Sequence, residues 1–269
     1  MGDILITGAA GQVGTMIRPY LLRRFGRLVL SDRVPPEALA EGETFRAADL
    51  TDAAALGAAL EGVSAILHLG AQGVDAGWDA VLPSNITGLI TLYETARMAG
   101  VERIVFASSV HAVGFYPRHA RFGPDVTPRP DGNYGASKAF GEAMTTLMAD
   151  KHGMRTLSIR VGNVNERPID RRRLSIWVHP EDLAQLCAIG LDGPGVSGQI
   201  VYGVSDNARG WWDNSAAFRL GYRPAHRSED YAEEVLAGAE APDPVGDLFQ
   251  GGTFCSDGFT GDAERTRWR

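Results

Sequence analysis

A glycine-rich turn near the amino terminus restricts the fold of this 269-residue chain more than any other feature. Asp3 to Thr7 is a short apolar run, which is typical of a buried parallel strand, and Gln12 to Phe25 has the pattern of a helix. The glycines between them allow a tight turn and let a pyrophosphate approach backbone N–H groups where the helix begins. The sequence therefore predicts a dinucleotide-binding turn, whose cofactor-binding residues are Gly8, Gly11, Gln12, Val13 and Gly14.

An acidic residue follows the next apolar run and indicates which dinucleotide is bound. The run from Arg27 to Ser31 ends at Asp32. A carboxylate at the tip of a second strand accepts hydrogen bonds from the ribose hydroxyls and repels a 2′-phosphate, so NAD is favoured over NADP. Two alternatives stay open, because Asp32 can be an ordinary turn residue and the neighbouring Arg33 can bind that phosphate.

Strand and helix patterns alternate along the rest of the chain. Further strands are predicted at residues 65–69, 103–107, 156–160 and 199–204, and helices at 52–60, 82–99, 134 onward and 180–191. This alternation predicts an α/β fold with a doubly wound parallel sheet (Rossmann) and a small carboxyl-terminal substrate lobe. Residues 1–160 would form the dinucleotide-binding domain, with returning segments near 176–206, and residues 161–175 and 207–269 the lobe, with a helix at 228–237 and an irregular tail.

Residues that follow the predicted strands are expected to complete the cofactor site. Small residues after the strand at 65–69 let the chain pass close under a cofactor, and His68 is interpreted as a core residue. The expected cofactor contacts beyond the glycine turn and Asp32 are Asp49, Leu50, Leu69, Gly70, Ala71, Asn85, Ala107 and Lys138.

The segment Tyr134 to Lys138 carries the expected catalytic chemistry. Residues four apart share one face of a helix, so the phenol of Tyr134 and the ammonium of Lys138 would lie side by side. The nearby cation is expected to lower the pKa of the phenol towards neutrality and so provide a general base. A serine hydroxyl from Ser109 would hold the substrate oxygen in line. Without the glycine turn, the same spacing would indicate only a solvated helix face.

Composition excludes several classes of protein. A net charge of −7 argues against nucleic acid or an anionic membrane as partner, and no apolar run is long enough to span a membrane. Cys187 and Cys255 have no metal-ligand spacing around them, so we expect reduced thiols and no metal site. With no signal peptide indicated, the expected location is the cytoplasm.

The combined motifs resemble known families. The glycine turn, the acidic residue after the second strand, the serine after the fifth strand and YxxxK resemble the short-chain dehydrogenase/reductase superfamily, and Asn85 to Gly88 resembles its extended branch. The segments TGAAGQVG, HLG, FASS-H--G-YP, RPDG-YG-SK-FGE, LS-W, GWWDNS and FQGGTF resemble the uronate dehydrogenases. These segments extend from residue 4 to about residue 254, which is nearly the whole chain.

This resemblance implies oxidation of the anomeric carbon of a hexuronic acid, such as glucuronate or galacturonate, to an aldaro-lactone with NAD as acceptor. It implies that Tyr134 is the base, that Lys138 lowers its pKa and holds the nicotinamide ribose, and that Ser109 positions the C1 hydroxyl. Arg172 would bind the substrate carboxylate, whereas Arg171 and Arg173 are interpreted as parts of a solvated loop. For Arg172 too, a solvated loop residue is the alternative. The implied substrate-binding residues are Ser109, His111, Tyr134, Asn163 and Arg172. Because superfamily members often pair through the helices carrying Asn85 and Tyr134, a homo-oligomer is expected.

Three positions depart from the family pattern and leave the sugar open. The family has Asn where this chain has Val110, and Ser at the positions of Gly73 and Asn163. Losing such polar groups can redirect specificity. An NAD-dependent dehydrogenase of another aldose or sugar acid is therefore the main alternative. A third interpretation is a nucleotide-sugar epimerase or dehydratase, which the short carboxyl-terminal part disfavours. The last is a non-catalytic dinucleotide sensor, which the retained Tyr134 and Lys138 disfavour.

Overall fold

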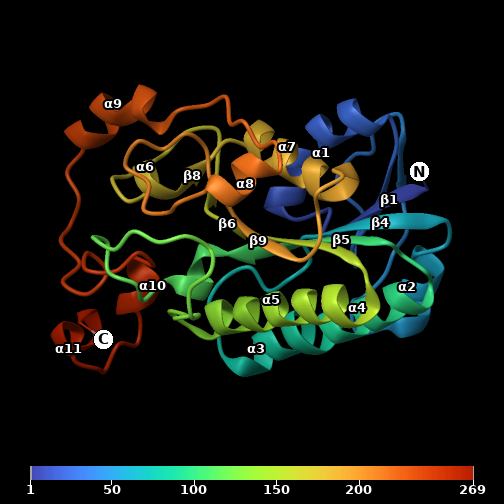
Figure 1. The fold of residues 1–269 in the computed structure, drawn as a ribbon, viewed down its shortest axis with the longest axis horizontal. Coiled ribbons are helices and arrows are strands. Elements are labelled where there is room, and N and C mark those ends of the chain that lie inside the picture. The colour runs from blue at the N-terminus through green and yellow to red at the C-terminus, as the bar shows by residue number, and fades with distance from the viewer. Residues whose placement is uncertain (1, 269) are drawn as a thin grey trace.

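A seven-stranded parallel sheet lies at the centre of the computed structural model, which describes residues 2–268 (Figure 1). The strands are ordered β3-β2-β1-β4-β5-β6-β9, and every neighbouring pair is parallel. The predicted α/β class with a doubly wound sheet is therefore confirmed. The strands are β1 Asp3–Thr7, β2 Leu28–Ser31, β3 Glu43–Phe45, β4 Val63–His68, β5 Arg103–Ser109, β6 Arg155–Val161 and β9 Gln199–Gly203.

Helices cover both faces of this sheet (Figure 1). Helices α1 (Gln12–Phe25) and α7 (Pro180–Asp192) lie on one face, and α2 (Ala53–Ala59), α4 (Leu89–Met98) and α5 (Asn133–His152) on the other. The core has one apolar cluster on each face, because neighbouring residues of a strand point to opposite sides. In β1, Ile4 and Ile6 belong to the first cluster, whereas Leu5 belongs to the second.

The predicted helix at 82–99 has three parts in the structure. It begins earlier, as α3 (Trp78–Leu82), continues as a π-helical segment (Pro83–Gly88) and ends as α4. Pro83 has no backbone N–H to donate, so one hydrogen bond of the α-helical ladder is missing where the π-helical segment begins. The π-helical segment carries Asn85, which is buried.

Most of the remaining elements lie beyond the carboxyl ends of the strands, at the left of Figure 1, whereas α8 (Ser215–Arg219) lies near its centre and packs against β9. Strands β7 (Asn163–Val164) and β8 (Trp177–Val178) form a small second sheet. The tail predicted as irregular contains two short helices, and the segment 228–237 is a 3₁₀ turn followed by a short helix. Helix α7 and strand β9 belong to the main layers, and the division into two domains with returning segments near 176–206 stays a prediction. The helices of this region are α6 Arg173–Ile176, α8 Ser215–Arg219, α9 Ala232–Ala237, α10 Thr253–Ser256 and α11 Ala263–Arg267.

Hydropathy separates these helices from membrane-spanning ones. Within residues 2–268, every helix falls short of the length and apolar character that crossing a membrane requires.

Candidate active site

Two adjoining cavities, of ≈ 420 Å³ and ≈ 300 Å³, form one cleft at the carboxyl ends of the strands. They share Leu69 and Ala71, which follow β4. The larger cavity is lined by the glycine turn, Asp32, Asp49, Leu50 and Gly70, and the smaller by Gln12, Val13, Ala107 and the predicted catalytic and substrate-binding residues. Every predicted site residue except Gly14 and Asn85 therefore lines this cleft.

The glycine turn has the geometry that a pyrophosphate site needs. Gly8 has a φ of +68°, and a Cβ added there would lie 2.5 Å from the backbone nitrogen of Gly70. Helix α1 begins after Gly11 without a side-chain cap, whereas α2 is capped by the carboxylate of Asp52. The first N–H groups of α1 consequently remain available to an anion, and the positive end of the helix dipole favours one.

Asp32 is held at the end of β2 beside this turn. Its carboxylate accepts hydrogen bonds from the backbone N–H of Ala10, at 3.1 Å, and of Arg33, at 2.8 Å. Nearby, the Asp49 carboxylate accepts from the backbone N–H and the hydroxyl of Thr51, which hold its pKa below the usual range. Both carboxylates are thus fixed in orientation along the larger cavity.

The predicted catalytic residues come from two neighbouring elements. Ser109 ends β5, and Tyr134 and Lys138 lie in the first turns of α5. The Nζ of Lys138 donates to the Ala107 carbonyl at 2.7 Å, which ties the helix to the strand. Burial lowers the pKa of Lys138 to about 8, although the charge of Glu142 opposes this shift.

The expectation that Lys138 lowers the pKa of Tyr134 towards neutrality is wrong for the protein in this state. The pKa of Tyr134 is raised to about 12, chiefly by burial. A hydrogen bond with Ser109 opposes this shift, and the charge of Asp131 adds to it. The lysine Nζ lies 5.5 Å from the centroid of the tyrosine ring, and its hydrogen bond goes to Ala107 instead. Desolvation of the phenolate therefore outweighs the nearby cation.

Asp75 caps the helix that carries Tyr134, and sequence analysis did not identify it. Its carboxylate accepts a hydrogen bond from the backbone N–H of Tyr134 at 2.8 Å, and Asn133 Nδ2 donates to the carbonyl of Ala76. The loop after β4 is thereby fixed against the start of α5. An acidic residue in a loop carries no local signal that it caps a helix distant in sequence.

Gly14 and Asn85 support the cleft from outside it. A Cβ at Gly14 would lie 2.8 Å from the carbonyl oxygens of Gly8 and Ala9, so this glycine packs α1 against the turn. The Asn85 amide accepts from Gln72 N, and it donates to Gln72 O and to Ser137 Oγ. Its polar atoms are thus occupied in positioning the loop after β4 and α5.

Arg172 presents a buried cation to the smaller cavity. Its Nε donates to the Gln250 carbonyl at 2.8 Å, whereas Nη2 is buried without a hydrogen-bond partner among the described residues. Gly252 packs on the side chain, since a Cβ there would lie 2.5 Å from Arg172 Cδ. Burial, followed by the charge of Arg173, lowers the pKa of Arg172 to about 10, so the group stays charged at neutral pH. A buried donor without a partner is costly, and an acceptor on a ligand in the cavity would satisfy it.

The two flanking arginines differ from each other. Arg171 is exposed and donates to the Leu236 carbonyl, as a residue of a solvated loop would. Arg173 instead lines the smaller cavity and forms an ion pair with Asp170, so the interpretation of Arg173 as a solvated residue is wrong. Arg173 is the first residue of the short helix α6, and its side chain is partly buried.

The carboxyl-terminal segment supplies further lining residues that the site prediction omitted. Thr253 and Phe254 line the smaller cavity, and the Phe254 ring stacks on His111 with 3.8 Å between centroids. Of the positions that depart from the family pattern, Val110, Gly73 and Asn163 all line this cavity. In the sequence, only the FQGGTF segment indicated that these residues belong to the site. No local pattern shows that the tail folds back over β5.

A buried ion pair holds the strands that carry these residues. Arg160 in β6 forms a two-point pair with Glu142 in α5, at 2.8 and 2.9 Å, and Ser108 donates to the same carboxylate at 2.6 Å. Burial lowers the pKa of Arg160, but its hydrogen bond and ion pair with Glu142 outweigh this, so the pKa is raised. The pair therefore joins β5, α5 and β6 directly behind the catalytic residues.

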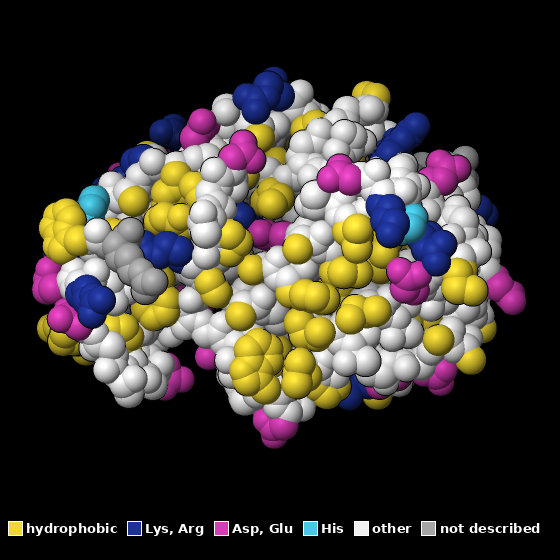
Figure 2. Space-filling view, turned by 60° about the horizontal axis from the view of Figure 1, so that its bottom comes forward, with side chains coloured by type: hydrophobic (Ala, Val, Ile, Leu, Met, Phe, Trp, Pro, Cys, Tyr) yellow, Lys and Arg dark blue, Asp and Glu magenta, His cyan; other side chains and the backbone are white. Residues whose placement is uncertain are grey.

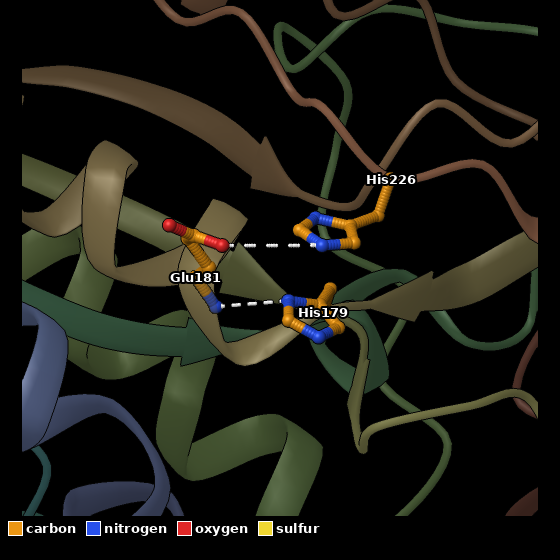
Figure 3. Close-up of side chains that lie close together, drawn as sticks. All are labelled: His179, Glu181 and His226. Atoms are coloured by element: carbon orange, nitrogen blue, oxygen red, sulfur yellow. Dashed lines mark hydrogen bonds and ion pairs between the residues drawn. The ribbon is translucent and has the colours of Figure 1, made fainter.

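A group of histidines outside the cleft has a structural arrangement (Figure 3). His179 and His226 stack at 3.5 Å between centroids, with Glu181 beside them. The Nδ1 of His179 accepts the backbone N–H of Glu181 at the start of α7, and its Nε2 faces Glu166 at 3.2 Å. Since both nitrogens of His179 have partners, the group is interpreted as a cap of α7.

The chain matches known proteins over nearly its whole length. Residues 4–168 match the NAD dependent epimerase/dehydratase family. A uronate dehydrogenase of Pseudomonas putida is 42% identical, with 95% of this chain and 96% of that protein covered. The structure of uronate dehydrogenase from Agrobacterium tumefaciens is 40% identical with a TM-score of 0.89, covering 94% of this chain and 96% of that one. A mutant of that enzyme, with one tyrosine replaced by alanine, was solved in complex with NAD; it is 39% identical with a TM-score of 0.89, covering 94% and 97%.

Proposed function

The chain belongs to the uronate dehydrogenases of the NAD dependent epimerase/dehydratase family, and on that premise we propose that it oxidises C1 of a hexuronic acid. It is an NAD-dependent oxidoreductase. The proposed substrate is the cyclic form of glucuronate or galacturonate, and the proposed product is the aldaro-lactone.

The side chains at the end of β5 and the start of α5 suit this reaction. We assign Ser109 to hold the C1 hydroxyl and Tyr134 to accept its proton, while NAD supplies the acceptor for the hydride that leaves C1. Loss of the proton and the hydride leaves a carbonyl at C1 within the ring, which is a lactone. Lys138 lines the same cavity, with its Nζ 5.5 Å from the centroid of the Tyr134 ring, and we assign it to hold the nicotinamide ribose. We base these roles on the acid–base chemistry of the side chains and on their positions in the smaller cavity.

The observation that carries the substrate class is the unpaired guanidinium of Arg172. Its Nη2 is buried, lacks a partner among residues 2–268, and belongs to the same cavity as Ser109 and Tyr134. A carboxylate matches a guanidinium in charge and in two-point geometry. A substrate with a carboxylate at one end and a reactive C1 hydroxyl at the other would use both groups.

A dehydrogenase of another aldose or sugar acid is the second candidate. Val110 is 3% exposed and contributes an apolar wall to the cavity. A sugar hydroxyl facing that wall would lose its hydrogen bond, which disfavours substrates that need one there. The choice between sugars therefore depends on positions such as Val110 and Gly73.

The direct test follows absorbance of the reduced cofactor with NAD and a panel of uronic acids and their matched neutral aldoses. We expect kcat/KM to be highest for a uronate. With NADP in place of NAD, kcat/KM should fall, because Asp32 places a negative charge where the 2′-phosphate would lie. Greater efficiency on neutral aldoses would reject the proposed substrate class, and equal efficiency with NADP would reject the role of Asp32.

We also propose that two copies of the chain pair through the face formed by α3, α4 and α5. Figure 2 shows hydrophobic side chains gathered on the face that these helices occupy. On these three helices, five large apolar residues are more than 40% exposed, namely Trp78, Leu82, Ile90, Met98 and Leu147. Exposed apolar surface of this extent on neighbouring helices favours an interface.

A further inference from the structure

We propose that Asp131 is a positioning residue for the reaction: it fixes the tautomer and the orientation of His111, so that His111 Nε2 is presented to the sugar. The proposal rests on the proposed oxidation of a sugar acid in the smaller cavity. Asp131 lies in the loop before α5 and belongs to neither the predicted nor the observed cavity lining.

The carboxylate of Asp131 occupies a cradle built largely from glycines. Its side chain is 0% exposed. A Cβ at Gly114 would lie 1.8 Å from Asp131 Oδ2, one at Gly251 would lie 2.1 Å from the same atom, and one at Gly135 would lie 3.0 Å from Oδ1. The segments around Gly114, Gly135 and Gly251 therefore leave room for this carboxylate, and a side chain at Gly114 or Gly251 would displace it.

The one hydrogen bond of this carboxylate goes to the active-site histidine. Asp131 Oδ2 lies 2.6 Å from His111 Nδ1, and Oδ1 is buried with no partner among the described residues. An ionised carboxylate only accepts hydrogen bonds, so the proton of this contact lies on Nδ1. The bond made by one ring nitrogen sets the state of the other, and Nε2 is then the nitrogen left for a ligand.

The imidazole is also held across its face. The Phe254 ring stacks on it with 3.8 Å between centroids and 24° between planes, and the Tyr134 ring meets it at 6.0 Å and 64°. The ring can therefore neither flip nor tilt without losing the carboxylate or the phenyl contact. His111 and Arg172 line the same cavity, so a sugar whose carboxylate pairs with Arg172 would lie in the cavity that His111 also lines.

The burial of Asp131 is costly, which argues for a specific role. A carboxylate removed from water with one hydrogen bond destabilises the fold unless positive charge lies nearby. Arg172 supplies part of that charge, since the charge of Asp131 raises the pKa of Arg172. Asp131 thus interacts with both groups proposed to bind the sugar, the arginine through charge and the histidine through a hydrogen bond.

The kinetic test replaces Asp131 by asparagine, which keeps the size but can donate to Nδ1 as well as accept from it. For Asp131→Asn we expect kcat/KM on the preferred uronate to fall about 10-fold or more, mainly through KM for the sugar, with KM for NAD unchanged. In a His111→Gln background the same change should have a much smaller effect, limited to the charge that Asp131 exerts on Arg172. Asp125→Asn, in the same loop and exposed, is the matched control and should behave as the wild type.

Two kinetic results would overturn the proposal: full activity of Asp131→Asn, or a loss that simply adds to that of His111→Gln. A spectroscopic measurement on the wild type does not depend on the folding of any variant. In ¹⁵N-resolved NMR of imidazole protons, we expect a far-downfield proton on His111 Nδ1, which His111→Gln removes. Protonation of Nε2 alone would overturn the proposal. If the enzyme oxidises neutral aldoses instead of uronates, the proposed substrate fails while this NMR result still decides the role of Asp131.

Discussion

The phenol of Tyr134 and the ammonium of Lys138 are both buried and face each other, with the lysine Nζ 5.5 Å from the centroid of the tyrosine ring. Burial raises the pKa of Tyr134 to about 12 and lowers that of Lys138 to about 8, so the first proton leaves the pair near the lower value. Coupled groups titrate as a pair, and the state with one proton removed includes the form with a phenolate beside an ammonium. We propose that this minor form, a phenolate of Tyr134 beside the ammonium of Lys138, is the general base of the reaction.

This coupling predicts the pH dependence of the reaction. The value of kcat/KM should rise with pH up to about 8, where the pair loses its first proton, and then level off. Lys138→Met should shift the rise to higher pH, since the remaining phenol has its pKa raised to about 12. Initial rates between about pH 6 and pH 10 measure this. A profile in Lys138→Met that matches the wild type would contradict the coupling.

Removal of the phenol itself has a separate expected outcome. In Tyr134→Phe, turnover should fall by about 10²–10⁴-fold because the general base is lost, while the affinity for NAD stays nearly unchanged. The cofactor is expected to be held by the glycine turn, Asp32 and Lys138. Single-turnover rates and fluorescence titration with NADH separate the two effects. A variant that keeps half its activity would remove Tyr134 from the mechanism.

Arg172 provides the sharpest test of the substrate class. In Arg172→Ala, kcat/KM on the preferred uronate should fall about 10–100-fold, since each charge-assisted hydrogen bond contributes roughly 1.5–3 kcal/mol. The matched neutral aldose should be affected little. Arg172→Lys should restore activity only in part, because lysine keeps the charge but lacks the two-point geometry. Arg171→Ala, at an exposed neighbour, is the control, and equal losses on uronate and aldose would reject carboxylate recognition.

At the scale of secondary-structure elements, the active site depends on how β5, α5 and β6 are joined. Ser109 ends β5, Tyr134 and Lys138 lie on α5, and the pair of Arg160 with Glu142 connects both elements to β6. The side chains of Arg160 and Glu142 are 1% and 4% exposed. Breaking one half of a buried pair leaves an uncompensated charge in the interior.

Glu142→Gln should therefore destabilise the protein by about 3–5 kcal/mol and reduce activity at elevated temperature. Glu94→Gln in α4 breaks an exposed pair with Arg97 and should change the stability by less than about 1 kcal/mol. Urea unfolding followed by circular dichroism gives both free energies. Similar losses in the two variants would mean that burial of the Arg160 pair does not decide its contribution.

At the scale of the whole molecule, the exposed apolar face of α3, α4 and α5 lies on the opposite side of the sheet from α1 and α7 (Figures 1 and 2). The cleft opens at the ends of the strands and not on this face. Two copies could consequently pair through these helices without closing the active site.

Leu147→Glu, on α5 and 43% exposed in the single chain, should shift the molar mass in light scattering from that of a dimer or larger assembly towards that of one chain. Burying an unpaired carboxylate in an apolar interface opposes association. Ile169→Glu, at a residue 62% exposed outside these helices, should leave the mass unchanged. An unchanged mass in Leu147→Glu would reject this face as the interface.

The amino-acid sequence by itself determined the features that depend on local periodicity and turn chemistry. The bounds of β1 and α1, the cap at Asp52 and the common helix of Tyr134 and Lys138 all follow from patterns within a few residues. The tertiary structure alone decided the surroundings of those side chains. The raised pKa of Tyr134, the unpaired nitrogen of Arg172 and the glycine cradle of Asp131 arise where segments distant along the chain meet. Desolvation and packing depend on every neighbour in space, whereas a local pattern specifies only neighbours along the chain.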